Sequence, residues 1–439
     1  MSVATEPVFD ELHPPLDRAA ALLEADRCLE CGGPYAPAPC MVACPAGVDV
    51  ASFVAAIAED EPLAAAQTIF TENLLGSTCA RVCPTEVLCE GACVLGEIGR
   101  KPIAIGALQR YATDEALAAG MPIRHAARWN GREVAVVGAG PAGLVCAGEL
   151  AALGYRVTVF DEREEVGGLV RYAIAPYRQV REPLPDEAEA LASIGVDFRL
   201  GTRVGADELD AIAKRVDAIF LGVGMGPDTA VSYPGDELPG VWNSLTFIEQ
   251  LKTGTPLRIW RHTVVVGGGN TAIDVAREAL RLGAEVVTVV YRRGEAEMPA
   301  YAHEVAEARA EGIHFQFLTD PVRILGSYRV EAVECRRMRL VEPDASGRRR
   351  PEPLPGSEFT LPADTVVKAI GQQPRRELAD WISGLELDGA GTVHVDPATG
   401  QTSNPKFFAG GDVVNGGVSA VEAVRDGKRA ARAIDEWLR

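Results

Sequence analysis

The sequence is short of positive charge. Its 439 residues include 43 Lys or Arg against 62 Asp or Glu, so the formal net charge is −19. A surface of this sign repels phosphate backbones and anionic lipid headgroups. We therefore expect neither a nucleic acid nor a membrane surface as a partner.

Long apolar runs are lacking too. No stretch reaches the roughly 18 to 20 uninterrupted apolar residues of a membrane-spanning helix, because Gly and Pro interrupt the longer uncharged runs. The first residues, MSVATEPVFDELHPPL, have no basic segment followed by an apolar one, which is the pattern of a secretory signal. We therefore expect a cytoplasmic protein. Hydrophobic residues make up 47%, an ordinary globular composition, and at about 150 residues per domain the length suggests about three domains.

Cysteine is nearly absent from most of the chain but crowded near its start. Beyond Cys93 only Cys146 and Cys335 occur, whereas eight cysteines fall between Cys28 and Cys93. In a reducing compartment this density favours metal ligation over disulfides. The six histidines lie in no recognisable catalytic or metal-binding motif.

The pattern of apolar residues divides the chain into segments of two kinds. Residues 1–130 read as short helices between the cysteines, with no long alternating strand pattern. A strand–helix–strand unit follows at Glu133–Phe160, and a comparable one recurs at His262–Tyr291. We expect an α/β protein in which a second nucleotide-binding domain, 245–364, is inserted into a first one made of 131–244 and 365–439.

Glycines open the helix of each unit. Gly138, Gly140 and Gly143 follow a strand, with Pro141 and Ala142 at the helix start. In such a loop the glycines allow a tight turn and close approach of a pyrophosphate to the helix N-terminus. Asp161 closes the next strand, where an acid accepts hydrogen bonds from a ribose, so this unit predicts a dinucleotide site.

The second unit differs at the end of its second strand. Its loop contains Gly267, Gly269, Asn270 and Thr271, but the strand ends in Arg292 and Arg293 instead of an acid. Two guanidinium groups suit the 2′-phosphate of NADP(H) better than NAD(H). The alternative is that both arginines merely form a solvated turn.

Two further segments are Val166-Gly167-Gly168-Leu169 and Ala409-Gly410-Gly411-Asp412. With the first glycine loop they resemble flavin-dependent pyridine-nucleotide oxidoreductases with two nucleotide domains. The resemblance implies FAD on the first unit and the nicotinamide cofactor on the inserted one, with Asp412 near the ribityl chain and a helix beginning near Val418 aimed at the isoalloxazine. The flavin-lining positions that it implies are Gly168, Leu169, Arg178, Gly411, Asp412, Val418, Ser419 and Ala420, and Gly371 falls where the two domains meet.

The cysteines form two runs, Cys28-x2-Cys31-x8-Cys40-x3-Cys44-Pro45 and Cys79-x3-Cys83-Pro84-x4-Cys89-x3-Cys93. A Cys-Pro after closely spaced cysteines is typical of ferredoxin-type binding, in which one cysteine of a run serves the other cluster. Eight thiolates suffice for two [4Fe-4S] clusters. All-thiolate zinc is the alternative, but zinc sites usually use closer pairs.

The whole chain resembles the family of the glutamate synthase small subunit and the electron-input half of dihydropyrimidine dehydrogenase. The resemblance implies one cluster on Cys28, Cys31, Cys40 and Cys93, and another on Cys44, Cys83, Cys89 and Gln109, which leaves Cys79 spare. One departure is the spacing between Cys31 and Cys40, eight residues where the family usually has about four. Glutamine at position 109 resembles the pyrimidine branch, whereas the glutamate synthase branch has Glu.

The resemblance implies an NAD(P)H-oxidising enzyme that passes electrons through FAD and the clusters to a separate catalytic subunit, because no barrel-sized domain is present after the nucleotide domains. We expect a partner of the dihydropyrimidine dehydrogenase type, which reduces uracil or thymine; the alternative is the glutamate synthase large subunit. A stand-alone disulfide reductase would need a Cys-x-x-Cys pair in the nucleotide domains, where only Cys146 and Cys335 occur. The last alternative is a zinc-stabilised binding module.

Overall fold

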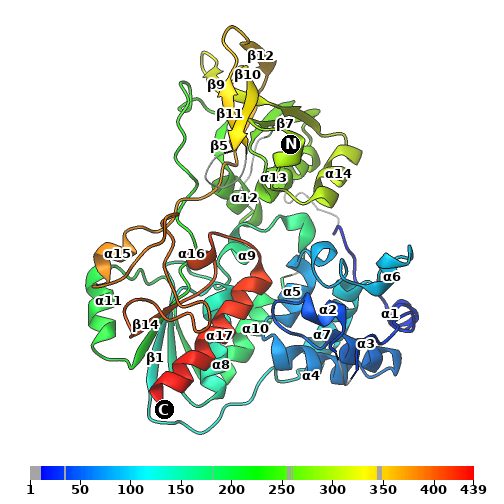
Figure 1. Cartoon of the computed structure of the whole chain (residues 1–439), viewed down its shortest axis with the longest axis vertical. Helices are drawn as coiled ribbons and strands as arrows, with labels where there is room; N and C mark the ends of the chain where they lie inside the picture. The colour runs from blue at the N-terminus through cyan, green and yellow to red at the C-terminus, as the bar shows by residue number, and fades with distance from the viewer. Residues whose placement is uncertain (1–10, 34–35, 181, 255–258, 260, 344–348) are drawn as a thin grey trace, which may run out of the picture. The chain divides into compact units, whose positions relative to one another are not determined.

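The computed structural model describes residues 11–33, 36–180, 182–254, 259, 261–343 and 349–439. Its contacts divide the described chain into two compact units. The larger unit contains residues 11–174, 178–225 and 374–439, and the smaller unit contains residues 175–177 and 226–373 (Figure 1). The smaller unit thus interrupts the chain of the larger one.

Short helices form the N-terminal part of the larger unit. Asp17 and Asp49 cap two of them by accepting hydrogen bonds from backbone N–H groups of the first turn. Apolar side chains at helical spacing, such as Phe53, Phe70 and Leu108, are fully buried, and each stabilises the fold by about 1.5–3 kcal/mol. The helices are α1 (Arg18–Ala25), α2 (Pro39–Val42), α3 (Val50–Ala58), α4 (Pro62–Glu72), α5 (Gly76–Val82), α6 (Val94–Glu97) and α7 (Ile105–Ala118), with a 3-10 turn at Thr85–Val87.

A five-stranded parallel sheet forms the rest of the larger unit. Its order is β14 (Phe407–Ala409), β4 (Ala218–Leu221), β1 (Glu133–Val137), β2 (Arg156–Phe160) and β3 (Val196–Arg199). The flanking helices are α8 (Pro141–Ala152), α9 (Leu169–Tyr172), α10 (Leu184–Ser193), α11 (Ala206–Ala213), α15 (Leu378–Trp381), α16 (Asp412–Asn415) and α17 (Ala420–Leu438). Helices α8 and α17 cross closely, since a Cβ on Gly427 would stand 2.2 Å from the Ala142 carbonyl oxygen.

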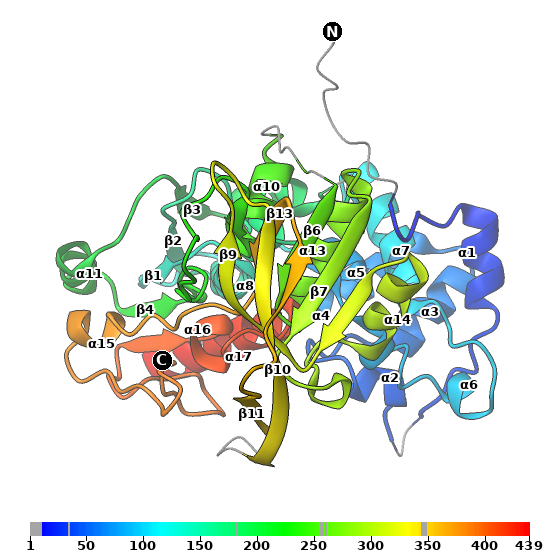
Figure 2. The same ribbon diagram turned by 90° about the horizontal axis from the view of Figure 1, so that it is seen from above.

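The smaller unit holds a second parallel sheet in the order β5 (Val241–Asn243), β13 (Thr365–Lys368), β6 (His262–Val266), β7 (Val286–Tyr291) and β8 (His314–Phe317). Helices α12 (Ser244–Lys252), α13 (Asn270–Arg281) and α14 (Ala302–Ala310) accompany it, with a 3-10 turn at Glu295–Glu297. An antiparallel sheet is built of β9 (Thr319–Leu325), β10 (Ala332–Pro343), β11 (Arg349–Pro353) and β12 (Phe359–Pro362). Figure 2 shows β10 continuing past β9 to the part that pairs with β11 in antiparallel fashion.

The two ends of the smaller unit's main segment pair with each other. Gly226 N donates to the carbonyl oxygen of Gln373 at 2.7 Å, and Gln373 N donates to that of Pro227 at 2.9 Å. The side chain of Gln372 also donates to the Gly226 carbonyl oxygen at 2.8 Å. We call these four residues the neck, because the chain enters and leaves the smaller unit through them.

The structure confirms the α/β class, with a helical N-terminal part and two nucleotide-fold sheets. The helix expected near Val418 begins at Ala420, two residues later. Helix α5 carries Cys79 itself and does not lie between cysteines as expected, and the short α16 directly after the last strand was not expected. Of the helices that the described residues form, none combines the length and hydrophobicity that crossing a bilayer requires.

Candidate functional site

Two glycines of the first loop, Gly138 and Gly143, have no room for a side chain. Gly138 has φ +104°, and a Cβ there would stand 2.3 Å from the Gly222 carbonyl oxygen. A Cβ on Gly143 would stand 1.9 Å from the Gly138 carbonyl oxygen. Gly140 caps α8, whose first residue is Pro141, so the backbone at this helix N-terminus is bare and suited to an anionic pyrophosphate.

Asp161 orders this loop as well as closing its strand. Its Oδ2 accepts a hydrogen bond from Ala139 N at 2.7 Å, and its Oδ1 accepts one from Arg163 N at 2.8 Å. Each carboxylate oxygen has a second lone pair for a ribose hydroxyl. The position therefore fits the adenosine side of a dinucleotide.

Two later segments meet the first loop. Gly168 has φ +53°, and a Cβ there would stand 3.1 Å from Cα of Gly140. Gly411, with φ +73°, faces the start of α8, where a Cβ would stand 3.1 Å from Cβ of Ala142. The structure therefore brings these three predicted glycine segments together around the N-terminus of α8.

Asp412 follows Gly411 at the start of α16. Burial, with a smaller contribution from the Asp426 carboxylate, raises the pKa of Asp412 to about 6. Ser419 caps α17 and accepts a hydrogen bond from Glu422 N, and Ala420 is the first helical residue. Val418 is exposed. Leu169 starts α9, and the half-buried Arg178 ends the 3-10 turn Pro176–Arg178.

The second loop repeats the glycine packing of the first. A Cβ on Gly267 would stand 2.0 Å from the Ala369 carbonyl oxygen, and Gly269 caps α13. The side-chain oxygen of Asn270 is engaged within the protein, because Oδ1 accepts a hydrogen bond from Tyr301 N at 2.9 Å. Thr271 is exposed on the first turn of α13, and Gly371 has φ +90° just before the end of the smaller unit.

The two arginines after β7 have different surroundings. Arg292 is exposed. Arg293 is 7% exposed, and its Nε donates to the Arg349 carbonyl oxygen of β11 at 2.9 Å. The expectation that both form one guanidinium pair for a phosphate therefore needs revision, because Arg293 is buried and bonded to β11 and only Arg292 has an exposed side chain.

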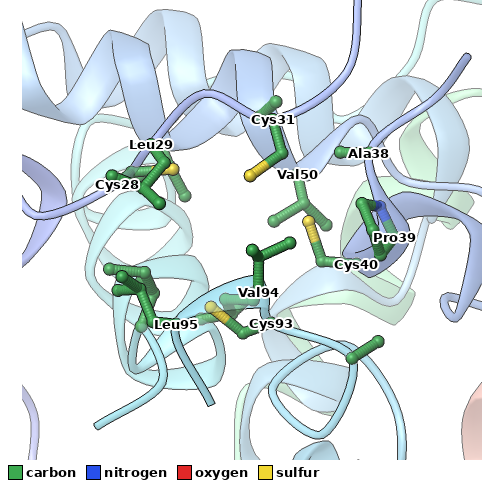
Figure 3. A pocket seen from close by; sticks show the side chains of 15 residues that line it. Cys28, Leu29, Cys31, Ala38, Pro39, Cys40, Val50, Cys93, Val94 and Leu95 are labelled. Carbon is green, nitrogen blue, oxygen red and sulfur yellow. The ribbon is translucent and has the colours of Figure 1, made fainter. Parts of the chain in front are cut away.

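The first cysteine set, Cys28, Cys31, Cys40 and Cys93, lines a single pocket. Figure 3 shows the four sulfur atoms around one space, with Val50 and Leu95 among the apolar side chains that complete it. Burial raises the pKa of Cys28, and that of Cys40 to about 11. The insert before Cys40 does not prevent this grouping, although residues 34 and 35 lie outside the described residues.

The second cysteine set, Cys44, Cys83 and Cys89, also interacts mutually. The pKa of the Cys83 thiol is raised first by a hydrogen bond with Cys79, then by burial, and further by the neighbouring Cys89 and Cys44. Cys79 therefore lies beside this set. Burial also raises the pKa of Cys44 and Cys89. Among the described residues, no three His, Cys, Asp or Glu side chains converge closely enough for a single metal ion.

Gln109, expected beside the second set, lies on α7, which packs against α5. Its Nε2 donates to the Gly76 carbonyl oxygen at 2.7 Å. That bond points the amide nitrogen toward α5 and leaves Oε1 as the atom with which an iron would bond. The amide orientation is assigned from this hydrogen bond.

Charged residues of the sheet part also reach the cysteine segments, and these were not foreseen. Glu187, fully buried on α10, accepts hydrogen bonds from Ser77 N at 2.8 Å and Thr78 N at 3.1 Å, directly before Cys79. Lys428 of α17 donates to the Ala46 carbonyl oxygen at 3.1 Å. A charged residue at an apolar position of a helix is the signal that sequence reasoning had available, as at Leu184, Glu187 and Leu191 on α10.

Comparisons with known proteins agree with these observations. A family model described as pyridine nucleotide-disulphide oxidoreductase matches residues 132–427, and one described as dihydropyrimidine dehydrogenase domain II, 4Fe-4S cluster, matches residues 5–121. The glutamate synthase [NADPH] small chain of Halomonas elongata is 39% identical, covering 98% of this chain and 93% of the relative. The Escherichia coli protein of that name is 37% identical over 98% and 94%. The chain belongs to the glutamate synthase small-chain family.

Membership of this family confirms the expected oxidoreductase with FAD, NAD(P) and 4Fe-4S iron-sulfur cofactors. The zinc-stabilised module is thereby wrong. The β subunit of NADP⁺-dependent formate dehydrogenase from Moorella thermoacetica is 39% identical over 92% of this chain and 60% of the relative. Chains similar to this one are therefore also found as subunits of an enzyme other than glutamate synthase.

Solved structures show the same fold at low identity. FprA of Mycobacterium tuberculosis in complex with NADPH has a TM-score of 0.59 at 22% identity, covering 70% of this chain and 84% of that one. Thioredoxin reductase of T. acidophilum has a TM-score of 0.54 at 20% identity, covering 70% and 100%. At such identities the likeness concerns the fold of the two nucleotide units and nothing more.

Proposed function

We propose that the chain oxidises NADPH and delivers the electrons to a separate catalytic subunit of the glutamate synthase large-chain type. The observation that carries this proposal is the shared compact unit. The cysteine-bearing helices and the first nucleotide sheet belong to one unit, held together through buried Glu187 and Lys428. Such packing supports electron transfer between cofactors bound on either side.

The choice of partner rests on the relatives. The two glutamate synthase small chains match along 93% and 94% of their length. Gln109 favoured a dihydropyrimidine dehydrogenase partner, but the comparisons support the alternative better. We therefore expect glutamate formation, and not uracil reduction, in the reconstitution experiment described below.

The residues of the chain have separate roles in this proposal. When bound, FAD takes up hydride equivalents and the clusters pass single electrons, chemistry that requires no acid–base pair from the protein. The N-terminus of α8 and its glycines hold the pyrophosphate of FAD. Asp161 binds a ribose, and Asp412 lies near the ribityl chain. Segments 168–169, 178 and 418–420 line the flavin, and the second glycine loop holds NADPH. The proposed domain limits are 1–130, 131–244 with 365–439, and 245–364.

We assign two iron-sulfur clusters to the two cysteine sets. The first set binds one cluster, and the second set binds another with Gln109 as its fourth ligand, which leaves Cys79 as a neighbour. Four thiols around one pocket suit a cluster, because its irons are each held by a thiolate. Anaerobically prepared protein should contain about eight iron and about eight acid-labile sulfide per chain. Stoichiometric zinc without iron would refute this assignment.

Nucleotide choice supplies a test at a single side chain. Since Arg292 is exposed and Arg293 is engaged with β11, Arg292→Ala should raise the Michaelis constant for NADPH about tenfold, or ~1.4 kcal/mol, and leave that for NADH unchanged. Arg350→Ala, which removes another exposed arginine of the smaller unit, serves as the matched control. Steady-state kinetics with both nucleotides decide this. Equal loss of both cofactors would contradict the assignment.

Reconstitution tests the partner. The isolated chain should reduce artificial dyes with NADPH but should not convert glutamine with 2-oxoglutarate. Adding a glutamate synthase large subunit should restore NADPH-dependent glutamate formation. Restoration of uracil reduction by a dihydropyrimidine dehydrogenase catalytic subunit, with no effect of the glutamate synthase subunit, would overturn the proposed partner.

A further inference from the structure

A buried ammonium group lies behind the second cysteine set. Lys428 on α17 is 7% exposed, and its Nζ donates to the carbonyl oxygens of Ala46 at 3.1 Å and Glu72 at 3.0 Å. It also pairs with the Glu72 carboxylate. Burying a lysine is costly unless it is paired and hydrogen-bonded, so three partners on the cysteine-bearing helical part fix this side chain in place.

One of these partners belongs to the turn that presents Cys44. The Gly47 N–H closes this turn by donating to the Cys44 carbonyl oxygen at 3.0 Å. The Ala46 carbonyl oxygen and the Gly47 N–H are the two ends of a single peptide group. A cation at the oxygen end polarises this peptide, which strengthens the hydrogen bond that closes the turn, and it places the ammonium charge two residues from Cys44.

Hydrogen bonds to cluster sulfurs and nearby charge are two of the factors that set the reduction potential of an iron-sulfur cluster. We propose that Lys428 is a positioning residue that raises the reduction potential of the cluster bound by Cys44, acting as a positive charge held at the turn that presents this thiol, and that the Glu72 carboxylate opposes it. The inference rests on the assignment of Cys44 to a cluster made above. It adds a residue from the far end of the chain that tunes this cluster.

The two members of the ion pair have opposite expected effects. Removing the lysine charge leaves the peptide less polarised and the Glu72 carboxylate uncompensated, which disfavours the added electron. Removing the carboxylate charge leaves the ammonium uncompensated, which favours the added electron. A purely structural link between α17 and the Cys44 turn would give no such reversal of sign, because both substitutions would only loosen it.

The experiment is a redox titration of the full chain with its clusters in place. Electron paramagnetic resonance and visible absorbance monitor the reduction of each cluster. At a fixed ambient potential, Lys428→Met should lower the reduced-to-oxidised ratio of one cluster about tenfold, which is about 59 mV for a one-electron couple. Glu72→Gln should raise the same ratio by several-fold. Lys428→Arg, which keeps the charge, should stay within about twofold of the unaltered chain.

Two results would overturn the proposal. One is a ratio that stays within twofold in both Lys428→Met and Glu72→Gln at full iron content; the other is a shift of both variants in the same direction. If Lys428→Met fails to retain its iron, the other two variants decide. The proposal then requires that Glu72→Gln raise the reduced-to-oxidised ratio and that Lys428→Arg leave it unchanged. An unaltered chain without iron or labile sulfide would refute the proposed function instead, so the two failures are distinguishable.

Discussion

The two cysteine sets come from interleaved runs of one sequence, yet they are embedded differently. The first set lines a pocket whose other walls are apolar, with Val50, Leu95 and Ile105 among them, and all of its lining comes from residues 28–105. The second set has buried charges from elsewhere in the chain behind it, Glu187 at α5 and Lys428 at the Cys44 turn. Residues near in sequence thus build the first site, whereas the second depends on the sheet part.

This difference teaches that a ligand motif specifies the donor atoms but not their setting. The same Cys-Pro signature stands at Cys44 and Cys83, both in the second set, while the first set draws its fourth thiol, Cys93, from beyond them. A cluster with apolar walls and one with buried charges should differ in reduction potential and in sensitivity to substitutions in the sheet part.

The sharpest way to separate the sets is to remove one thiol from the second. Cys44→Ser should lower the iron content from about eight to about four per chain and reduce electron delivery to the partner subunit by at least about a hundredfold. NADPH-dependent dye reduction should largely persist, since dyes can accept electrons directly from the flavin. Iron analysis and both activity assays check this. Delivery that survives loss of this cluster would show that electrons bypass the cysteine sets.

A smaller effect should distinguish Gln109 from Cys79 at the second set. Gln109→Ala should remove one ligand and change the paramagnetic resonance spectrum of that cluster, while Cys79→Ala should leave iron content and spectrum unchanged. The two variants are matched because each removes one side chain next to the second set. Cys79 forms a hydrogen bond with Cys83, and Gln109 lies on the helix packed against α5. If Cys79→Ala loses iron and Gln109→Ala does not, the thiol and not the amide is the fourth ligand.

The smallest expected effect concerns the pH dependence of stability. Burial raises the pKa of Glu187 to about 7, above the ordinary value near 4.5. The folded protein therefore holds this proton more tightly than the unfolded chain does, and the free energy of unfolding should fall as the pH rises from about 4.5 to about 7, by on the order of 1–3 kcal/mol.

Glu187→Gln should remove that part of the pH dependence, because the amide does not titrate yet still accepts from Ser77 N and Thr78 N. Denaturant unfolding between about pH 4.5 and about pH 8 measures it. Glu189→Gln, an exposed neighbour on α10, is the control. Parallel pH profiles for the unaltered chain and Glu187→Gln would show that Glu187 is already ionised in the folded protein.

Much of the fold was predictable because its signals are local. Glu133–Val137 and Arg156–Phe160 are β-branched runs that the structure reproduces residue for residue, and the glycines between them have the tight contacts that the motif demands. The family, the fold class and the cofactors were confirmed for the same reason. Glycine spacing, strand composition and cysteine spacing are all properties of short segments.

The features that escaped prediction depend on contacts between distant residues. Helix α5 contains Gly76 and Thr78, poor helix formers, and it has no capping side chain of its own; Glu187, 110 residues beyond Ser77, accepts its first N–H groups. The burial of Arg293 likewise depends on β11, far along the chain. Gln109 did not identify the partner, because one side chain on α7 says nothing about the surface that the partner contacts.

The neck gives the molecule the character of a cassette. Because Gly226 and Gln373 bond to each other, the residues joined to them, Met225 and Pro374, emerge side by side. A few linking residues would therefore close the chain of the larger unit after excision of 226–373, and a different nucleotide-recognition module with adjacent ends would fit the same junction. Such an exchange must carry residues 175–177 with it, because the hydroxyl of Tyr177 donates to Asp274 at 2.6 Å inside the removed part.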